Sequence, residues 1–287
     1  MFRMEHRYDI LAAANSARFY LRHYARGIYP PASLHPLRLP VNRMFFPLRN
    51  PNGKCNYIRD CRGTCILEPG RFYFIPAFYA AEVHLDEDLY FLSIQSSLEI
   101  CPGTELFSDC SSMQVLPAPA ELPLLLKLFE SPTEKLPFSS LELRAAVFAV
   151  LIRVLALYPE EDFQNPLLLR HYSVLTDYLS QHGNASTRVS QLADFLGESR
   201  EGFTRRFSSE TGITPKQLID RFLMSKALDL LNGNASVKEV ACLLNFSSEF
   251  AFSRFFKKHM GEAPNHWRKN PLSAGTYSST KSRNAVL

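Results

Sequence analysis

The N-terminal half of the chain alternates short apolar runs with turn-forming residues. Between residues 41 and 97, runs such as Met44–Phe46 and Arg71–Ile75 are separated by turn signals such as Asn50–Gly53 and Pro69–Gly70. Short strands with a turn about every 8–12 residues are typical of a small all-β barrel or sandwich. We therefore predict a small β-barrel domain within residues 1–135.

Two helices are predicted to follow this domain, in residues 136–184. Ser139–Tyr158 has apolar residues at steps of three and four, which indicates a helix with one buried face. Pro166–Gln181 is the second helix, because Pro166 suits a first turn and Gly183 suits an end. We expect the two helices to pack between domains or to form a dimer seam. The stripe expected to be buried on the first helix is Leu141, Ala145, Phe148, Leu151, Ile152 and Leu155.

The two ends of the chain differ from this central pattern. Tyr8–Arg26 fits a short amphipathic helix, whereas residues 271–287 are rich in Ser, Thr and Asn and are expected to form a disordered tail. Neither a secretory signal nor a run of about 18 apolar residues is present in the sequence. The sequence therefore predicts a cytoplasmic protein without a membrane partner.

The C-terminal third contains an imperfect internal duplication. Phe203–Phe207 and Phe252–Phe256 are displaced by 49 residues, and Val189–Leu196 maps onto Val237–Leu244 with a displacement of 48 residues. A repeat of this kind indicates that one supersecondary unit occurs twice. Because the displacement rises from 48 to 49 residues between the first and the second helix of the unit, the second copy has one extra residue at its turn.

Each copy has the pattern of a helix-turn-helix unit, over residues 188–209 and 236–259. The predicted turns hold Gly197 and Asn245, residue types that tolerate a positive φ. Pro215–Leu231 is predicted to be a rigid helix connecting the units. Predicted helix caps are Ser186 or Thr187, Ser199, Ser236, and Ser247 or Ser248, and the predicted terminating glycines are Gly212 and Gly261.

The second helix of each unit carries polar and basic residues outside its buried phenylalanines. A helix fits the major groove, where Arg bonds guanine and Glu accepts from cytosine, while Lys and Arg also bind phosphates. Single surface cations are usually only solvated, so the duplicated pattern carries this prediction rather than the charge. The predicted DNA contacts are Ser199, Arg200, Glu201, Thr204, Arg205, Arg206, Lys216, Ser248, Glu249, Phe250, Ser253, Arg254, Lys257 and Lys258.

The segment Ser247–Lys258, together with Trp267–Lys269 after it and Ala227–Leu231 before it, resembles the AraC/XylS signature. The resemblance covers residues 186–269. It implies an all-helical DNA-binding domain, at residues 185–270, whose two recognition helices enter successive major grooves. By position, the resemblance places Glu201, Thr204, Arg205 and Arg254 where family members contact bases.

The chain departs from the family pattern at three places. Asn245 replaces a usual glycine, and Ala251 replaces a usual aromatic residue. Ser208 and Ser209 stand where the first unit usually has a basic pair. We therefore expect the second unit to carry more of the phosphate contact than is common.

The segment Leu67–Pro76 resembles, more loosely, the cupin-like effector domain of many such regulators. This resemblance implies a barrel that binds a small molecule, frequently a sugar. The predicted fold class is thus an α+β multidomain protein with a cupin-like barrel, linking helices and an all-α double helix-turn-helix domain. Candidate pocket residues are Arg43, Tyr57, Tyr73 and His84, although aromatic residues in strands are more often plain core.

Charge and cysteine content leave two alternatives to consider. The net charge of +4 permits a polyanionic partner without requiring one, and the six cysteines are expected to be free thiols. A cupin-type metalloenzyme would need a His-x-His pair, which the sequence lacks. A cysteine-using DNA-repair regulator would share the helix-turn-helix domain, and Cys55, Cys61 and Cys65 are close in sequence but form no Cys-x-x-Cys pair.

We therefore predict a sequence-specific transcription regulator and not an enzyme, with no cofactor and no metal. Its predicted partners are double-stranded DNA and a small-molecule effector, for which a sugar is one candidate class. A second copy of the chain and RNA polymerase are candidate further partners.

Overall fold

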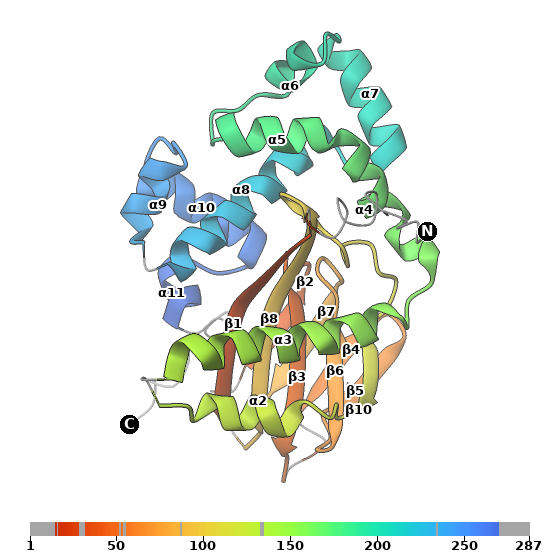
Figure 1. Cartoon of the computed structure of the whole chain (residues 1–287), viewed down its shortest axis with the longest axis vertical. Coiled ribbons are helices and arrows are strands. Elements are labelled where there is room, and N and C mark those ends of the chain that lie inside the picture. The colour runs from red at the N-terminus through yellow and green to blue at the C-terminus, as the bar shows by residue number, and fades with distance from the viewer. Residues whose placement is uncertain are drawn as a thin grey trace, which may run out of the picture.

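The computed structural model describes residues 15, 17–28, 32–51, 53, 56–86, 88–132, 135–233 and 235–269. Two β-sheets and two covering helices form the N-terminal part of the described chain, and helices alone form the C-terminal part (Figure 1). The predicted disordered tail at 271–287, residues 8–14 and 16 of the predicted N-terminal helix, and Cys55 lie outside the described residues. None of the helices in the described ranges is long and apolar enough to cross a membrane.

The described strands form two antiparallel sheets that are not hydrogen-bonded to each other. The first sheet has the order β1-β8-β3-β6-β10, with β9 beside β8, and the second has the order β2-β7-β4-β5. A closed barrel was predicted, and among the described strands the arrangement is the open sandwich that the same pattern also allowed. The strands of the first sheet are β1 (Arg18–Ile28), β3 (Asn42–Arg49), β6 (Arg71–Ile75), β8 (Tyr90–Cys101), β9 (Thr104–Glu105) and β10 (Gln114–Pro117). Those of the second are β2 (Ala32–Leu37), β4 (Tyr57–Asp60), β5 (Gly63–Ile66) and β7 (Ala81–Leu85).

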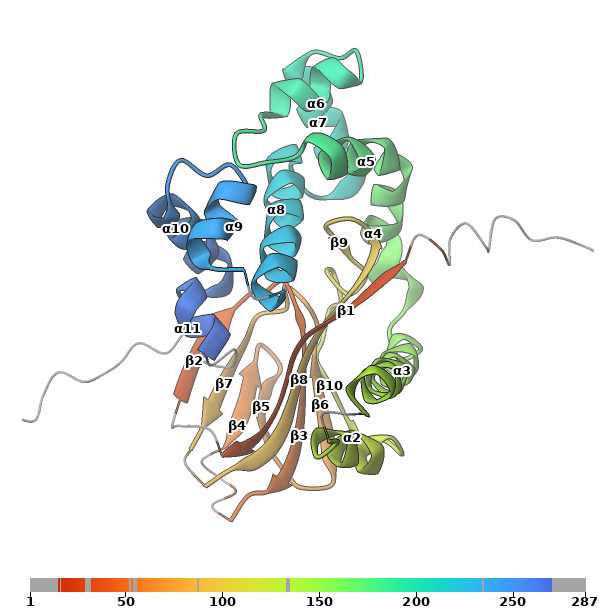
Figure 2. The same ribbon diagram turned by 60° about the vertical axis from the view of Figure 1, so that its left-hand side comes forward.

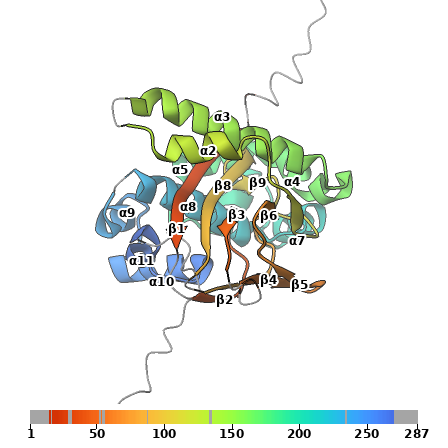
Figure 3. The same ribbon diagram turned by 90° about the horizontal axis from the view of Figure 1, so that it is seen from below.

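Successive side chains along the strands of the first sheet point to opposite faces, and each face packs into a separate hydrophobic core. Phe45 and Tyr73 face the second sheet, where they pack with Ile58 and Val83. Met44 and its alternate neighbours point to the opposite face, against helices. Figure 3 shows the resulting order of layers, with helices on one side of the first sheet and the second sheet on the other.

Helices α2 (Leu122–Phe129) and α3 (Leu136–Leu155) cover the outer face of the first sheet (Figures 2 and 3). Most of the α3 stripe that was predicted to be buried is exposed, with Leu141 65% and Ile152 45% exposed, whereas Leu151 of that stripe is fully buried as predicted. The side chains of α3 that pack on the sheet are Ala146, Val147, Val150, Leu151 and Val154, with Leu155 partly buried against them. Apolar residues lie on both faces of this helix, so periodicity alone did not show which face meets the sheet.

The predicted helix at Tyr8–Arg26 is wrong over residues 18–26. Residues 18–28 form β1, which pairs along β8 from Arg18 opposite Glu99 to Ile28 opposite Tyr90. A long neighbouring strand supplies a hydrogen-bond partner for nearly every residue, and such a partner outweighs a weak local helical pattern.

The predicted single helix Pro166–Gln181 is two helices in the structure. A 3-10 turn at Arg170–Tyr172 separates α4 (Gln164–Leu169) from α5 (Ser173–His182). The remaining helices form two compact groups on either side of α8 (Pro215–Asn232) (Figure 1). One group contains α6 (Val189–Phe195) and α7 (Arg200–Thr211), and the other contains α9 (Val237–Leu243), α10 (Glu249–Met260) and α11 (Pro264–Lys269).

The N-terminal sheets contact α8 directly. The buried side chain of Arg22 on β1 pairs with Asp229 of α8 and donates to Ser225 Oγ at 3.2 Å. Leu39 and Val41, between β2 and β3, are buried in the hydrophobic cluster of the second helix-turn-helix unit. The helix that connects the two units is therefore also the helix that the N-terminal part holds.

Candidate DNA-binding surface

The first unit consists of α6 and α7 around a turn at Gly197, whose φ is 71°. Ser199 caps α7 by accepting the Gly202 N–H at 3.2 Å, and Gly212 ends it in the left-handed conformation. These predicted features are confirmed. The predicted cap of α6 is wrong, because Arg188 takes that position and Thr187 accepts from a residue of the preceding turn.

The second unit repeats this construction with α9 and α10. Asn245 holds the turn with a φ of 56°, a conformation that Asn tolerates better than most residues. Ser236 caps α9, and Ser248 caps α10 by accepting the Ala251 N–H at 3.0 Å. Gly261 ends α10 in the left-handed conformation, as predicted.

Paired phenylalanines anchor both second helices. Phe203 and Phe207 are fully buried with α6 and α8, and Phe252 and Phe256 are fully buried with α8 and α9. Because each pair fixes which face of its helix points inward, the opposite face of α7 and of α10 is left to solvent.

The relative position of the two units is set by α8 and by direct bonds between them. α8 begins with a capping box at Thr214 and Gln217. The Ala185 N–H donates to the Leu244 carbonyl at 2.8 Å, and the Asn245 side chain donates to Ser186 Oγ at 3.2 Å. No sequence pattern indicated these bonds, which join the entry of one unit to the turn of the other.

The predicted contact residues on α7 and at the start of α8 differ in exposure and in whether they are already ion-paired. Arg200, Glu201 and Arg205 are exposed, and Thr204 is half-buried with its hydroxyl bonded to the Arg200 carbonyl at 2.7 Å. Arg206 instead pairs with Glu198 and donates to Tyr172 Oη at 2.6 Å. The cap Ser199 is exposed at the start of the helix. Lys216, at the start of α8, is exposed and pairs with Asp220 at 2.9 Å.

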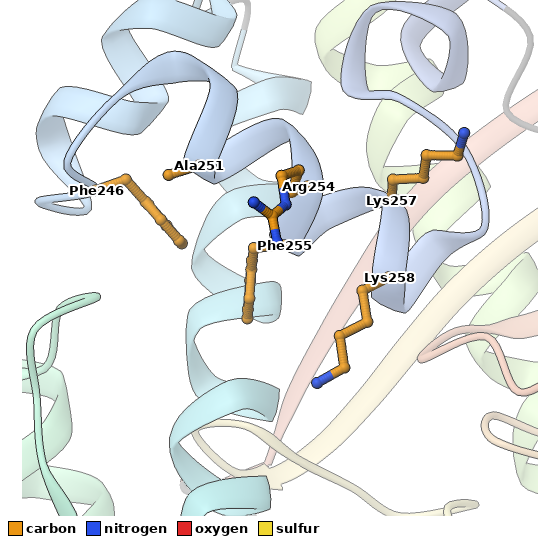
Figure 4. Close-up of a pocket in the computed structure, with 6 residues that line it drawn as sticks. All are labelled: Phe246, Ala251, Arg254, Phe255, Lys257 and Lys258. Atoms are coloured by element: carbon orange, nitrogen blue, oxygen red, sulfur yellow. The ribbon is translucent and has the colours of Figure 1, made fainter.

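The predicted contact residues on α10 lie along one side of the helix. Its exposed cap Ser248 is followed by exposed Glu249 and by Phe250, which is 70% exposed, and Ser253 is half-buried. Arg254, Lys257 and Lys258 line a groove of about 620 Å³ that Phe246, Ala251 and Phe255 complete (Figure 4). We call this feature the α10 groove. Three cationic side chains at one concave surface provide the charge that phosphate oxygens require.

The four candidate pocket residues of the N-terminal part are not brought together. Arg43 and Tyr73 are buried on the face of the first sheet that looks toward the second. Tyr57 and His84 are stacked with ring centroids 5.0 Å apart, on the face of the second sheet opposite buried Ile58. Only the first pair therefore faces the space between the two sheets, which the buried side chains of a hydrophobic core occupy.

Two of the three cysteines of the alternative repair function, Cys61 and Cys65, lie on the β4–β5 hairpin. Cys61 is exposed at its turn with its sulfur 4.0 Å from Tyr79 Oη, and Cys65 is half-buried on β5. Within the described ranges, no group of three or more His, Cys, Asp or Glu side chains is arranged to hold a metal ion.

Comparisons with known proteins place the helical part in a family. A family described as a helix-turn-helix domain matches residues 192–270. The raffinose operon transcriptional regulatory protein RafR of Pediococcus pentosaceus is 21% identical over 234 residues, which cover 75% of this chain and 84% of RafR. A putative AraC-like transcription regulator of Streptomyces lividans is 33% identical over 87 residues, which cover 30% of this chain and 29% of that protein.

A solved structure matches nearly the whole fold. The structure of ToxT from Vibrio cholerae with a bound unsaturated fatty acid has a TM-score of 0.53 and 11% sequence identity, and the match covers 91% of this chain and 98% of ToxT. The similarity shows a shared two-part architecture of sheets followed by helices. Residues 192–270 thus carry a helix-turn-helix domain, and this part of the chain is similar to the corresponding part of an AraC-like transcription regulator.

Proposed function

We propose that this regulator recognises one specific DNA site with α7 and α10 in successive major grooves. The observation that carries the proposal is the pair of capped helices with exposed polar faces, joined by α8 and by the bonds from Ala185 to Leu244 and from Asn245 to Ser186. Two recognition helices in fixed relation need little reordering when they dock, so both contribute to affinity.

Selection of bound DNA from a random pool tests this proposal. We expect a recovered site with two conserved elements about one helical turn, roughly 10 base pairs, apart. A single short element, or no enrichment over non-specific binding, would contradict simultaneous reading by both units.

The proposal includes a small-molecule effector between the two N-terminal sheets. Arg43 and Tyr73 lie there, in the same sheet as the strand that carries Arg22 and its contacts with α8. A ligand that shifts β1 relative to the second sheet would therefore act on the helix between the two reading units. The sugar class predicted from the sequence is consistent with the name of RafR, whereas the matching ToxT structure carries a fatty acid.

The proposal also includes a second copy of the chain, docked on the exposed face of α3. Phe138, Leu141, Phe148 and Ile152 are between 39% and 74% exposed, and the steps from Phe138 to Leu141, from Leu141 to Phe148 and from Phe148 to Ile152 follow a heptad repeat. Apolar positions with this spacing on a helix of 20 residues are suited to pairing with an identical helix. RNA polymerase as a partner stays a prediction.

The oligomeric state tests the role of α3. Light scattering after gel filtration should give a dimer for the natural chain and a monomer for Leu141→Glu. The matched control is Leu167→Glu on α4, where Leu167 is 48% exposed outside the α3 stripe. A natural chain that stays monomeric at high concentration, or a Leu141→Glu variant that stays dimeric, would exclude this interface.

A further inference from the structure

Three polar side chains form a row across the first sheet. His23 on β1 lies opposite Gln95 on β8, and Gln95 lies opposite Arg43 on β3. Residues directly opposite each other in adjacent antiparallel strands place their side chains on the same face of the sheet. The row therefore spans three neighbouring strands on one face.

That face looks toward the second sheet. The strand neighbours Tyr24, Ile94 and Met44 pack on the helix side, so the row points the other way. Phe45, two positions after Arg43, is buried in the core between the sheets. The polar row is thus enclosed where the effector is proposed to bind.

Arg43 has no acidic partner among the described residues. Its side chain is buried, its Nη2 donates to the Tyr79 carbonyl at 3.3 Å, and its Nε has no hydrogen-bond partner there. Burial lowers the pKa of Arg43 to about 10, so the guanidinium remains charged at neutral pH. By contrast, Arg22 on the same sheet is equally buried and pairs with Asp229 and Glu99.

The neighbours of Arg43 in the row bring no opposite charge. Burial lowers the pKa of His23 to about 4, so its ring is neutral at pH 7, and its Nε2 is buried without a partner among the described residues. The Gln95 amide carries no charge. A buried cation beside neutral groups is unfavourable until a counter-ion arrives.

We infer that the effector carries an anionic group, a carboxylate or a phosphate, which pairs with Arg43 between the two sheets while His23 and Gln95 bond its neutral polar atoms. The inference rests on the proposed effector site and names the class of molecule that fills it. A guanidinium binds either anion through two parallel hydrogen bonds, which gives both affinity and orientation. A neutral sugar would leave the charge of Arg43 without compensation.

Thermal unfolding of the full chain with matched probe pairs tests the inference. The probes are glucuronate and glucose 6-phosphate against glucose, and octanoate against octanol. We expect at least one anionic probe to raise the midpoint by roughly 2–4 °C at millimolar concentration, and its neutral counterpart to leave it unchanged. The two sugar anions distinguish a carboxylate requirement from a phosphate requirement. No shift from any anionic probe would overturn the inference.

A substitution of Arg43 adds a measurement that needs no ligand. Arg43→Met keeps much of the volume and removes the buried charge, so the midpoint without probe should not fall and the anion-induced shift should disappear. Arg49→Met, at an exposed position on the same strand, should keep that shift. A fall in the midpoint of Arg43→Met with the anion response retained would assign Arg43 to structure and overturn the inference.

The outcomes separate this inference from the proposed function. A shift with glucose and none with glucuronate or glucose 6-phosphate would keep the effector role and reject its anionic class. DNA selection by the natural chain does not depend on Arg43. It therefore tests the two helix-turn-helix units independently of the effector role and of the effector's anionic class.

Discussion

The first and second helix-turn-helix units share their caps, turns and buried phenylalanines, yet α7 and α10 carry different side chains at matching positions. Ser208 and Ser209 in the first unit correspond to Lys257 and Lys258 in the second. Arg206 corresponds to Phe255, which packs against the cores of both units. The internal construction of a unit is thus independent of the charge that it offers to DNA.

Arg206 shows how a basic residue on a recognition helix can serve the fold. It pairs with Glu198 in the turn of its own unit, is 3.7 Å from Glu210 and bonds Tyr172 between α4 and α5. The bond to Tyr172 joins α7 to the linking helices, and the bond to Glu198 joins it to the turn before it. The second unit keeps Arg254 and two lysines in the α10 groove, so we expect it to supply more of the affinity.

The largest expected effect is the loss of stability when a buried phenylalanine that both units share is removed, and this loss should be equal in the two units. Phe203→Ala and Phe252→Ala each remove a fully buried ring, so each should lower the free energy of unfolding by about 3–5 kcal/mol. Urea unfolding followed by circular dichroism measures both. Phe250→Ala on the exposed face of α10 is the control and should change stability by less than about 0.5 kcal/mol.

The next effect separates base reading from phosphate contact. Arg254→Ala should weaken binding to the selected site by about 1–3 kcal/mol and relax the preference at one base pair, and Arg205→Ala should do the same in the other element. Binding titrations on the selected site and its single-base variants measure this. Lys127→Ala removes the same charge from α2 and should have no effect. A loss that is equal on all sequences would reassign Arg254 to a phosphate.

The difference between the units should also be visible in the salt dependence. Replacing Lys257 and Lys258 together with Ala should reduce the slope of log affinity against log salt by about 2, with little change in sequence preference. The reciprocal change, Ser208→Lys with Ser209→Lys, should steepen that slope if α7 approaches the backbone as α10 does. An unchanged slope in the double Ala variant would show that the α10 groove does not face phosphates.

The smallest effect concerns the caps. Ser199→Ala and Ser248→Ala should each cost about 1 kcal/mol of stability, measured by urea unfolding, because each leaves one helix N–H without its acceptor. Glycine at either position should cost only a few tenths of a kcal/mol. A loss of stability for only one of the two alanine variants would show that, in the other unit, the first N–H groups of the helix find a different hydrogen-bond acceptor.

Local chemistry made the helix-turn-helix units predictable from the sequence. Gly197 and Asn245 tolerate a positive φ, Ser199 and Ser248 offer an oxygen at a helix start, and Phe203 and its equivalents repeat at helical spacing. Each of these signals depends on residues within about one helical turn, so the sequence contains all the information needed.

Other features could not be predicted because their causes lie far away in the chain. Arg18–Ile28 is a strand only because β8 lies beside it, and the buried face of α3 depends on which apolar stripe meets the first sheet. The linking helix breaks at Arg170–Tyr172 without a proline or glycine there to mark the break. The position of Arg43 opposite Gln95 follows from strand register, which no local pattern reveals.

The sequence by itself determined the duplicated units, their turns, the caps of both recognition helices and the exposed polar face of each, since short-range geometry and hydrophobic spacing fix these. Only the tertiary structure decided which cations are already paired, which face of α3 is open and which charge is buried between the sheets. The physical reason is that pairing and burial depend on neighbours distant in sequence. Arg206 and Arg43 are both arginines, and only their surroundings make one a structural ion pair and the other a buried cation without a counter-ion among the described residues.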